Sequence, residues 1–216
     1  MKSIIYILIL LLFTSCASHH VLHTDTPYNG IDVSHYQGDI NWARVTQKGN
    51  IRFVYIKATE GKNFVDNRHA SYGRDAKKHG LLVGYYHFFR PGVSGADQFA
   101  NYEKSLQGLP NDLIPVLDIE VAPKPGQQQA FEHDIHTFIK LCHKRYGKYP
   151  ILYCIPNFER KYLKAFAKRK KWYCGKIDAQ ADMKRCLLWQ TAIKNVPGIY
   201  GKVDWDYAPK VKKLKK

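Results

Sequence analysis

The order of apolar segments along the chain constrains its fold more than any other feature of the sequence. Eight runs rich in β-branched and aromatic residues are predicted as strands, within residues 30–36, 52–59, 81–89, 113–120, 149–156, 171–177, 186–192 and 201–208. The last three runs leave little room for helices, but helical patterns follow each of the first five, at residues 40–48, 67–79, 97–106, 127–146 and 158–170. This alternation predicts an α/β fold whose parallel sheet closes into a modified TIM-like barrel, with five β/α units followed by three strands, (β/α)5(β)3.

The fourth predicted strand carries two acids inside an otherwise apolar run. It reads IPVLDIE over residues 114–120 and contains Asp118 and Glu120 at spacing i, i+2. Because side chains alternate between the two faces of a strand, both acids point the same way, roughly 6.6 Å apart along the backbone, and Leu117 and Ile119 point the other way. A buried pair of like charges is unfavourable, so the pair needs either cationic partners or a chemical role.

Both readings of the acidic pair have candidates in the sequence. In a purely structural reading, Lys57 and Arg90 neutralise the two acids within a scaffold network. Further acids lie in the first and last predicted strands, at Asp32 and Asp204. In barrels of this type the chemistry gathers at the carboxyl ends of the strands, where acids from strands one, four and eight would meet. That convergence favours a functional site.

The N-terminus has the pattern of an export signal. Lys2 precedes an apolar run over residues 4–13, which is too short to span a membrane and is followed by a polar segment. Phe-Thr-Ser-Cys at residues 13–16 resembles the lipobox of bacterial lipoproteins, which predicts a signal peptide over residues 1–15 and a diacylglycerol on Cys16. The alternative is ordinary signal cleavage near Ala17. We expect an exported protein that its lipid anchors to a membrane of the cell envelope.

The rest of the chain is predicted as one basic domain, which we expect to be a monomer. Residues 16–28 have no usable period and are predicted as a tether, and residues 29–216 are predicted as the barrel with a basic C-terminal tail. The formal charge of +16 becomes +15 when Lys2 is removed, which favours polyanionic partners such as cell-wall polymers and lipid headgroups. Nucleic acid is not expected, because no recognition motif accompanies the charge. The runs 168–171 and 210–216 are typical of solvated faces and tails.

Four further cysteines lie beyond Cys16, at positions 142, 154, 174 and 186. Export permits disulfides, and four cysteines allow three complete pairings. Cys174 and Cys186 are close enough in sequence to close a local loop, whereas Cys142 and Cys154 lie in helical and strand patterns and are expected as buried thiols. No spacing in the sequence suggests a metal site, and we expect no cofactor.

The motifs of the predicted strands, taken in order, resemble those of glycoside hydrolase family 25, the Chalaropsis-type lysozymes. They are GIDVSHYQG, IKATEG, GYYHFFRP, VLDIE, ILYC, LWQT and VDWD, and they extend from about residue 29 to residue 207. One region departs from the family, whose sixth strand usually resembles Leu-Trp-Ile-Ala where this chain has KWYCGKIDAQADM.

The resemblance implies a peptidoglycan muramidase that cleaves the β-1,4 bond between N-acetylmuramic acid and N-acetylglucosamine. The family's Asp-x-Glu motif falls on Asp118 and Glu120, with the Glu as general acid, and its other active-site acids fall on Asp32 and Asp204. The saccharide contacts predicted beside them are Tyr86, His87, Lys57, Tyr153, Trp189 and Gln190. The aromatic residues among these are also compatible with plain packing, His87 with a core position, and Lys57 with an ion pair to Glu60.

Neighbouring carboxylates on one strand face cannot easily flank a sugar as two independent catalytic groups. An i, i+2 pair better fits substrate assistance, in which the sugar's own 2-acetamido oxygen attacks C1 while Glu120 protonates the leaving oxygen and Asp118 orients the acetamide. Asp32 and Asp204 would hold this arrangement, although either is also a candidate nucleophile. The competing function is a non-catalytic peptidoglycan-binding lipoprotein on the same barrel.

Overall fold

The computed structural model describes residues 27–48, 50–176 and 180–216. The predicted signal peptide, the lipidation site Cys16 and all but the last two residues of the predicted tether lie outside the described residues. The first strand begins at Tyr28, one residue before the predicted start of the domain.

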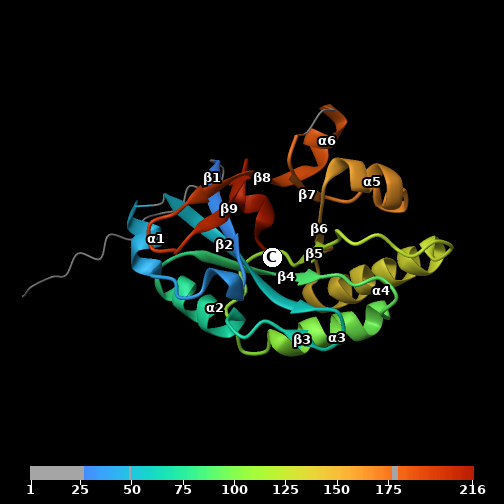
Figure 1. Ribbon diagram of the computed structural model, residues 1–216, viewed down its shortest axis with the longest axis horizontal. Coiled ribbons are helices and arrows are strands. Elements are labelled where there is room, and N and C mark those ends of the chain that lie inside the picture. The colour runs from blue at the N-terminus through green and yellow to red at the C-terminus, as the bar shows by residue number, and fades with distance from the viewer. Residues whose placement is uncertain (1–26, 49, 177–179) are drawn as a thin grey trace, which may run out of the picture.

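Eight strands form a closed barrel, which confirms the predicted fold class (Figure 1). Around the barrel the order is β1-β9-β8-β7-β6-β5-β4-β2, and pairing of β1 with β2 closes the sheet. Their bounds are β1 Tyr28–Val33, β2 Ile51–Glu60, β4 Leu82–Phe88, β5 Val116–Asp118, β6 Ile151–Cys154, β7 Lys171–Cys174, β8 Cys186–Asn195 and β9 Lys202–Ala208.

The helices follow the predicted pattern with local differences. Figure 1 shows α2, α3 and α4 along one side of the barrel. The α-helices are α1 Trp42–Lys48, α2 His69–Lys78, α3 Gly95–Ser105, α4 Gln128–Tyr146, α5 Pro156–Tyr162 and α6 Gln180–Arg185, and the 3-10 turns are η1 His35–Gln37, η2 Lys164–Phe166 and η3 Val211–Leu214. The predicted helix at 158–170 is thus divided into α5 and η2, and α6 lies where little room for a helix was expected.

Two strand features were not predicted. A short strand, β3 (Phe64–Val65), forms a hairpin with the end of β2 beyond the barrel wall. In addition, β9 runs antiparallel to both of its neighbours, β1 and β8, although the other barrel strands pair in parallel. The reversal follows from the short connection between β8 and β9, because parallel neighbours need a crossover of a dozen or more residues.

The inside of the barrel is filled at the amino ends of the strands and open at the carboxyl ends. Along β2, Phe53 and Tyr55 are fully buried in an inner cluster that also holds Val211 and Leu214 of η3. The backbone N–H of Ile114 donates to the carbonyl of Leu214 over 2.7 Å, which ties η3 across this end. The amino end of the barrel is therefore a packed base, and the carboxyl end forms its mouth.

Close packing inside the base depends on glycine. A Cβ at Gly30 on β1 would lie 2.2 Å from the ring of Phe53, and a Cβ at Gly84 on β4 would lie 2.4 Å from the ring of Tyr55. Both distances are below any permissible contact between heavy atoms. The two aromatic rings occupy the space that these glycines leave, which fixes how far the apolar filling extends toward the mouth.

Two further expectations concern cysteines and membrane spans. Cys142 and Cys154 are buried thiols, as predicted, and within the described ranges no disulfide joins Cys174 to Cys186. None of the helices in the described ranges combines the length and apolarity that crossing a membrane requires.

Candidate active site

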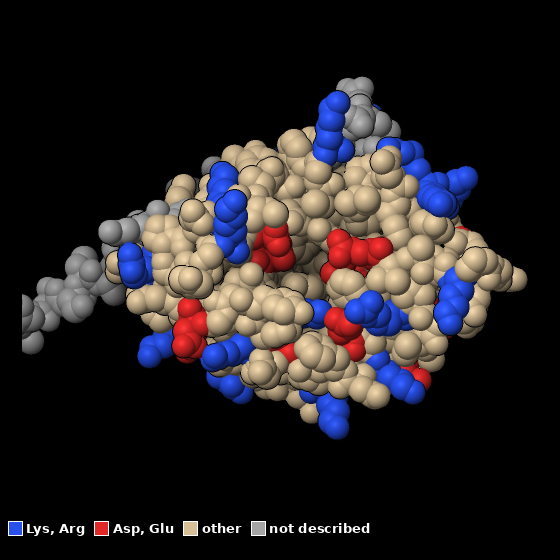
Figure 2. Space-filling model, viewed as in Figure 1, with Lys and Arg blue, Asp and Glu red and all other residues tan. Residues whose placement is uncertain are grey.

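A cavity of about 260 Å³ opens at the mouth of the barrel. Figure 2 shows acidic side chains gathered around this hollow. Side chains from β1, β2, β4, β5, β6, β7, β8 and β9, with η1, line it, and the residues are Asp32, Val33, Ser34, Tyr36, Gln37, Lys57, Tyr86, Phe88, Val116, Asp118, Glu120, Tyr153, Trp172, Gln190 and Asp204. All four acids predicted from the sequence therefore lie at one cavity.

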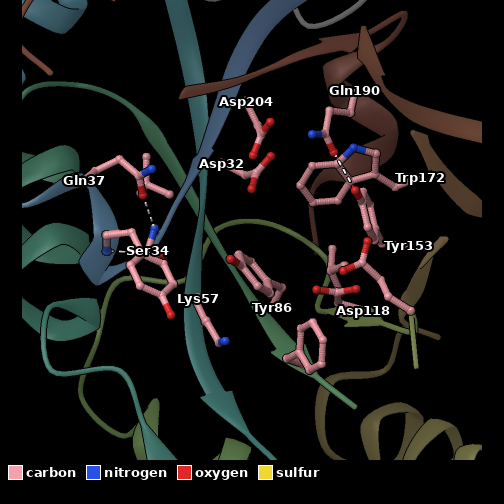
Figure 3. A pocket seen from close by; sticks show the side chains of 15 residues that line it. Asp32, Ser34, Gln37, Lys57, Tyr86, Asp118, Tyr153, Trp172, Gln190 and Asp204 are labelled. Atoms are coloured by element: carbon pink, nitrogen blue, oxygen red, sulfur yellow. Dashed lines mark hydrogen bonds between the residues drawn. The ribbon is translucent and has the colours of Figure 1, made fainter. Parts of the chain in front are cut away.

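Asp32 and Asp204 face each other on one side of the cavity (Figure 3). Asp32 is the penultimate residue of β1, and Asp204 lies near the start of β9. The two residues are directly paired in the antiparallel register. Because β9 is reversed, an acid near its amino end reaches the mouth that the other strands reach with their carboxyl ends.

Asp118 and Glu120 follow the predicted alternation. Asp118 ends β5, lines the cavity and is only 7% exposed, whereas Leu117 and Ile119 are fully buried in the layer outside the barrel. Glu120 comes just after the strand, lines the same cavity and is exposed to solvent. The pair thus has one buried member and one accessible member.

The pKa values of both carboxyls are raised, and burial is the largest cause for each. Burial raises the pKa of Asp118 well above its usual range, and the charges of Glu120 and Asp32 raise it further. The pKa of Glu120 is also raised, first by partial burial and then by the charge of Asp204. Because like charges repel each other, protonation of one of the two carboxyls is favoured. Glu120 is the member that combines a raised pKa with access to solvent.

Asp206 of β9 lies deeper than the cavity lining and forms a second carboxyl pair with Asp32. Asp206 is completely buried, and one of its oxygens accepts a hydrogen bond from Trp172 Nε1 over 3.1 Å. Among the described residues no donor reaches Oδ2 of Asp32 or Oδ2 of Asp206. Burial raises the pKa of both groups, and a hydrogen bond between the two side chains satisfies these oxygens only if the pair holds a proton. Asp206 lies within β9.

Lys57 and Arg90 bind Glu60 instead of the acids on β5. Lys57 Nζ lies 2.6 Å from Glu60 Oε2, and Arg90 Nε donates to Glu60 Oε1 over 2.8 Å. Lys57 is 9% exposed and lines the cavity, and its charge lowers the pKa of Asp118 without overcoming the effect of burial. The predicted ion pair of Lys57 with Glu60 is therefore present, and the scaffold network that would neutralise Asp118 and Glu120 is not formed by direct contacts.

A hydrogen-bonded link connects the two sides of the cavity. The Tyr153 hydroxyl donates to Gln190 Oε1 over 2.7 Å (Figure 3), and Glu120 also lies within hydrogen-bonding reach of that hydroxyl. Gln190 in turn bonds the carboxylate of Asp204, which opposes the rise in the pKa of that group. Glu120 and Asp204 are therefore coupled through two neutral side chains.

Two of the predicted contact residues do not reach the cavity. His87 is fully buried on the outer face of β4, where its ring bonds Thr59 Oγ1 at 2.7 Å and stacks on Phe138. Burial lowers the pKa of His87 to about 4. Trp189 donates through Nε1 to the carbonyl of Gly175 over 2.7 Å and does not line the cavity. His87 therefore occupies a core position, which was the alternative interpretation from the sequence.

The sequence reading missed several lining residues. Trp172 closes the floor beside Tyr153, with ring centroids 5.2 Å apart, and its only sequence signal is its inward phase on the sixth predicted strand. The η1 turn after β1 brings Ser34, Tyr36 and Gln37 to the rim. A capping box in which Ser34 N donates to Gln37 Oε1 over 2.8 Å holds this turn, and the serine and glutamine spacing could have predicted it.

The arrangement provides acid–base chemistry on a polar substrate. In the ranges that the structure describes, no group of three or more His, Cys, Asp or Glu side chains is placed to hold a metal ion. The cavity instead offers one accessible carboxyl with a raised pKa, one buried carboxyl beside it, and a third and fourth across the mouth. A barrel with this arrangement at its mouth is suited to acid–base catalysis on a bound substrate.

Comparison with known protein families identifies the kind of enzyme. The model of the glycosyl hydrolases family 25 matches residues 31–199, and the chain therefore belongs to that family. The protein is thus a glycoside hydrolase. Lysozyme M1 of Streptomyces globisporus is 41% identical over 122 residues, which cover 54% of this chain and 41% of that protein.

Solved structures agree with the family assignment. A family 25 glycosyl hydrolase from Bacillus anthracis superposes with a TM-score of 0.74 at 29% identity, over 84% of this chain and 88% of that chain. A lysozyme from Streptomyces coelicolor gives a TM-score of 0.73 at 27% identity, over 87% and 94% of the two chains. Relatives in this family thus include enzymes named lysozymes.

Proposed function

We propose that the protein is a peptidoglycan muramidase, which hydrolyses the β-1,4 bond between N-acetylmuramic acid and N-acetylglucosamine. The observation that carries the proposal is the meeting of Asp32, Asp118, Glu120 and Asp204 in one cavity at the barrel mouth. Similarity to proteins named lysozymes supports this choice of substrate. A module that only binds glycan has no need for acids whose burial is so unfavourable.

Glu120 is the proposed general acid and base. Partial burial and the charge of Asp204 raise its pKa, which favours the protonated form that a general acid needs, and its exposure lets the carboxyl reach the oxygen between two sugars. In the first step the C1–O bond of muramic acid breaks, and Glu120 transfers its proton to the departing O4 of glucosamine. In the second step water attacks C1, the bond between C1 and the acetamido oxygen breaks, and the ionised Glu120 takes a proton from that water.

Asp118 is the proposed partner of the substrate's acetamido group. It lies two residues from Glu120 on the same side of the strand, so it cannot attack the opposite face of the same sugar. The acetamido oxygen attacks C1 instead, and Asp118 holds the acetamide N–H as positive charge develops on the new ring. Two displacements at C1 retain the anomeric configuration. A nucleophilic Asp32 or Asp204 would instead form a glycosyl ester with the enzyme.

The remaining lining residues are proposed to bind the saccharide. Tyr86, Tyr153, Lys57 and Gln190 line the cavity and offer hydroxyl, ammonium and amide groups to sugar hydroxyls and acetamides. Asp32 and Asp204 face each other at one side of the cavity, which supports a role for both in contacting the sugar ring. His87 is fully buried and is not among the proposed contacts, and Trp189 lies outside the cavity.

Digestion of purified peptidoglycan tests the proposal. Glu120→Gln keeps the shape of the side chain but removes the proton donor, so the rate should fall by on the order of 10² to 10⁴ while the melting temperature stays near wild type. Glu132→Gln on the outside of α4 is the matched control and should remain active. Mass spectrometry of the products should show N-acetylmuramic acid at the new reducing ends. Full activity of Glu120→Gln would refute the assignment, and undigested glycan bound by the wild type would indicate a binding protein.

Export and lipidation of Cys16 complete the proposal. The sequence FTSC after an apolar run supports a lipoprotein signal, and two or three acyl chains on one residue suffice for stable anchoring because each buried CH₂ contributes about 0.8 kcal/mol. Wild-type protein should partition into detergent, and Cys16→Ser should remain in the aqueous phase. Equal partitioning of both proteins would contradict lipidation.

A further inference from the structure

Exposed lysines gather at the base of the barrel, the end opposite the mouth. The base comprises the amino ends of the strands, the loops that enter them, the last turns of the helices and the C-terminal segment with η3. We call the following set of exposed residues the basal lysines: Lys78, Lys144, Lys148, Lys168, Lys170, Lys210, Lys212 and Lys213. The four acids of the candidate active site lie at the other end of the barrel.

Few acids at the base offset this charge. Asp112 pairs with Lys77 at 2.6 Å, and Glu103 pairs with Arg145 at 3.1 Å, which leaves these two cations and two acids neutral as pairs. Asp75 is a third, exposed acid on α2. None of the basal lysines takes part in an ion pair with these three acids among the described residues. The basal charge is therefore available to an external anion.

Helix stabilisation explains only part of the pattern. Lys78 and Lys144 lie in the last turns of α2 and α4, where a cation interacts favourably with the helix dipole. Lys148, Lys168 and Lys170 lie instead in the loops that enter β6 and β7. The remaining three flank or occupy the short η3 turn after the last strand, so six of the eight basal lysines do not lie in the last turn of an α-helix.

The chain enters the barrel at this same end. Tyr28, the first residue of β1, pairs with Ala208, the last residue of β9, in antiparallel register. Residues 27 and 209 therefore leave the barrel side by side. Val211 and Leu214 of η3 are fully buried in the base, which holds Lys212 and Lys213 on its outer side. Residue 27 therefore lies beside the C-terminal segment that carries Lys210, Lys212 and Lys213.

We propose that the basal lysines dock the enzyme on the anionic lipid headgroups of the membrane that holds its lipid anchor. This inference rests on the proposed lipidation of Cys16. Eleven residues lie between Cys16 and Tyr28, and a chain of that length can reach up to about 40 Å, enough for the base to contact the bilayer surface. In this orientation the mouth with its four acids points away from the membrane, toward glycan strands.

Vesicle binding of the lipidated protein tests the proposal. The variant Lys210→Gln/Lys212→Gln/Lys213→Gln removes three charges from the base. As a matched control, Lys62→Gln/Lys124→Gln/Lys202→Gln removes three exposed charges from the mouth end, two in loops and one at the start of β9. Partitioning is measured by sedimentation on neutral phosphatidylcholine vesicles and on vesicles with one third phosphatidylglycerol. The wild type should bind the anionic vesicles more tightly at 50 mM NaCl and lose most of that preference at 500 mM.

The two triple variants should then differ. Each lysine near an anionic surface strengthens binding roughly fivefold, so the basal variant should lose on the order of 100-fold in its preference for anionic vesicles, and the mouth variant should lose little. Equal losses in both variants, or no anionic preference in the wild type, would overturn the proposal. So would a basal variant that loses binding to a soluble poly(glycerol phosphate) but not to vesicles, because the partner would then be a wall polymer.

The outcome is separable from the catalytic proposal. Hydrolysis of soluble glycan fragments should be the same for wild type and the basal variant, because the base is the opposite end of the barrel from the cavity. Loss of hydrolysis with normal vesicle binding would contradict the proposed function alone. If Cys16 carries no lipid, binding to neutral vesicles disappears, but the difference between anionic and neutral vesicles still tests the basal lysines.

Discussion

The buried Asp32–Asp206 pair makes stability depend on pH in a direction that can be measured. Burial raises the pKa of both carboxyls, so the folded protein keeps a proton that the unfolded chain releases above about pH 4. The unfolded state then binds fewer protons than the folded state, and the free energy of unfolding falls as the pH rises. The stability of the pair is fully present below about pH 4 and is lost as the pH rises toward the folded-state pKa values.

Asp206→Asn should remove this dependence and stabilise the protein at neutral pH. The amide keeps the shape of the carboxyl, its oxygen can accept from Trp172 Nε1, and its NH₂ group can donate to Asp32. Holding one carboxyl protonated at pH 7 costs up to about 4 kcal/mol relative to the ionised group in the unfolded chain, and the amide avoids that cost. For a domain of this size each kcal/mol corresponds to about 2–4 °C in Tm.

The assay is thermal unfolding followed by circular dichroism from pH 4 to pH 8. Asp206→Asn should match the wild type near pH 4 and exceed its Tm by an increasing margin above pH 5. Asp75→Asn, which removes an exposed carboxylate on α2, controls for the change in net charge and should follow the wild-type curve. Parallel curves for wild type and Asp206→Asn would show that the pair holds no proton and would refute the reasoning.

Three further changes test the site and the fold. Lys57→Met removes a cation that lowers the pKa of Glu120, so the basic limb of the kcat/KM profile should move to higher pH, and an unmoved limb would exclude Glu120 as the titrating acid. Tyr153→Phe removes the hydroxyl that donates to Gln190 and lies within hydrogen-bonding reach of Glu120, and should lower kcat by roughly 10-fold with an unchanged melt, whereas full activity would make Tyr153 a packing residue. Gly95→Ala would place a Cβ 1.9 Å from the carbonyl oxygen of Asp134 and should cost about 1–3 kcal/mol or more in urea unfolding, and wild-type stability would contradict the close approach of α3 and α4.

The barrel and the acids of its mouth could be predicted because each depends on a local pattern. Apolar runs separated by helical segments indicate the order of strands, and alternation along β5 separates Asp118 from Leu117. The rule that chemistry gathers at carboxyl ends located Asp32 correctly. The same rule placed Asp204 at the mouth, but this residue lies there because it is near the amino end of a reversed strand.

The sequence alone could not show which of Tyr86 and His87 faces the cavity. Neighbours on a regular strand point to opposite faces, so both cannot line one cavity, and the run YYHFF has no polar contrast that would fix the phase. The same holds for Trp189 and Gln190 on β8. Asp206 and Trp172 meet only when β9 and β7 are brought together across the barrel, and no spacing in the sequence encodes that contact.

The anomeric configuration of the first product tests the proposed mechanism most directly. The central claim is that Asp118 and Glu120, on one side of one strand, act with the substrate's acetamide as nucleophile. Proton NMR of a defined glycan fragment, recorded within the first turnovers, distinguishes the two anomers before mutarotation. We predict that the new reducing end of N-acetylmuramic acid appears first as the β anomer, because two displacements retain the configuration. First appearance of the α anomer would contradict the claim and indicate a water held between Glu120 and a carboxylate across the mouth.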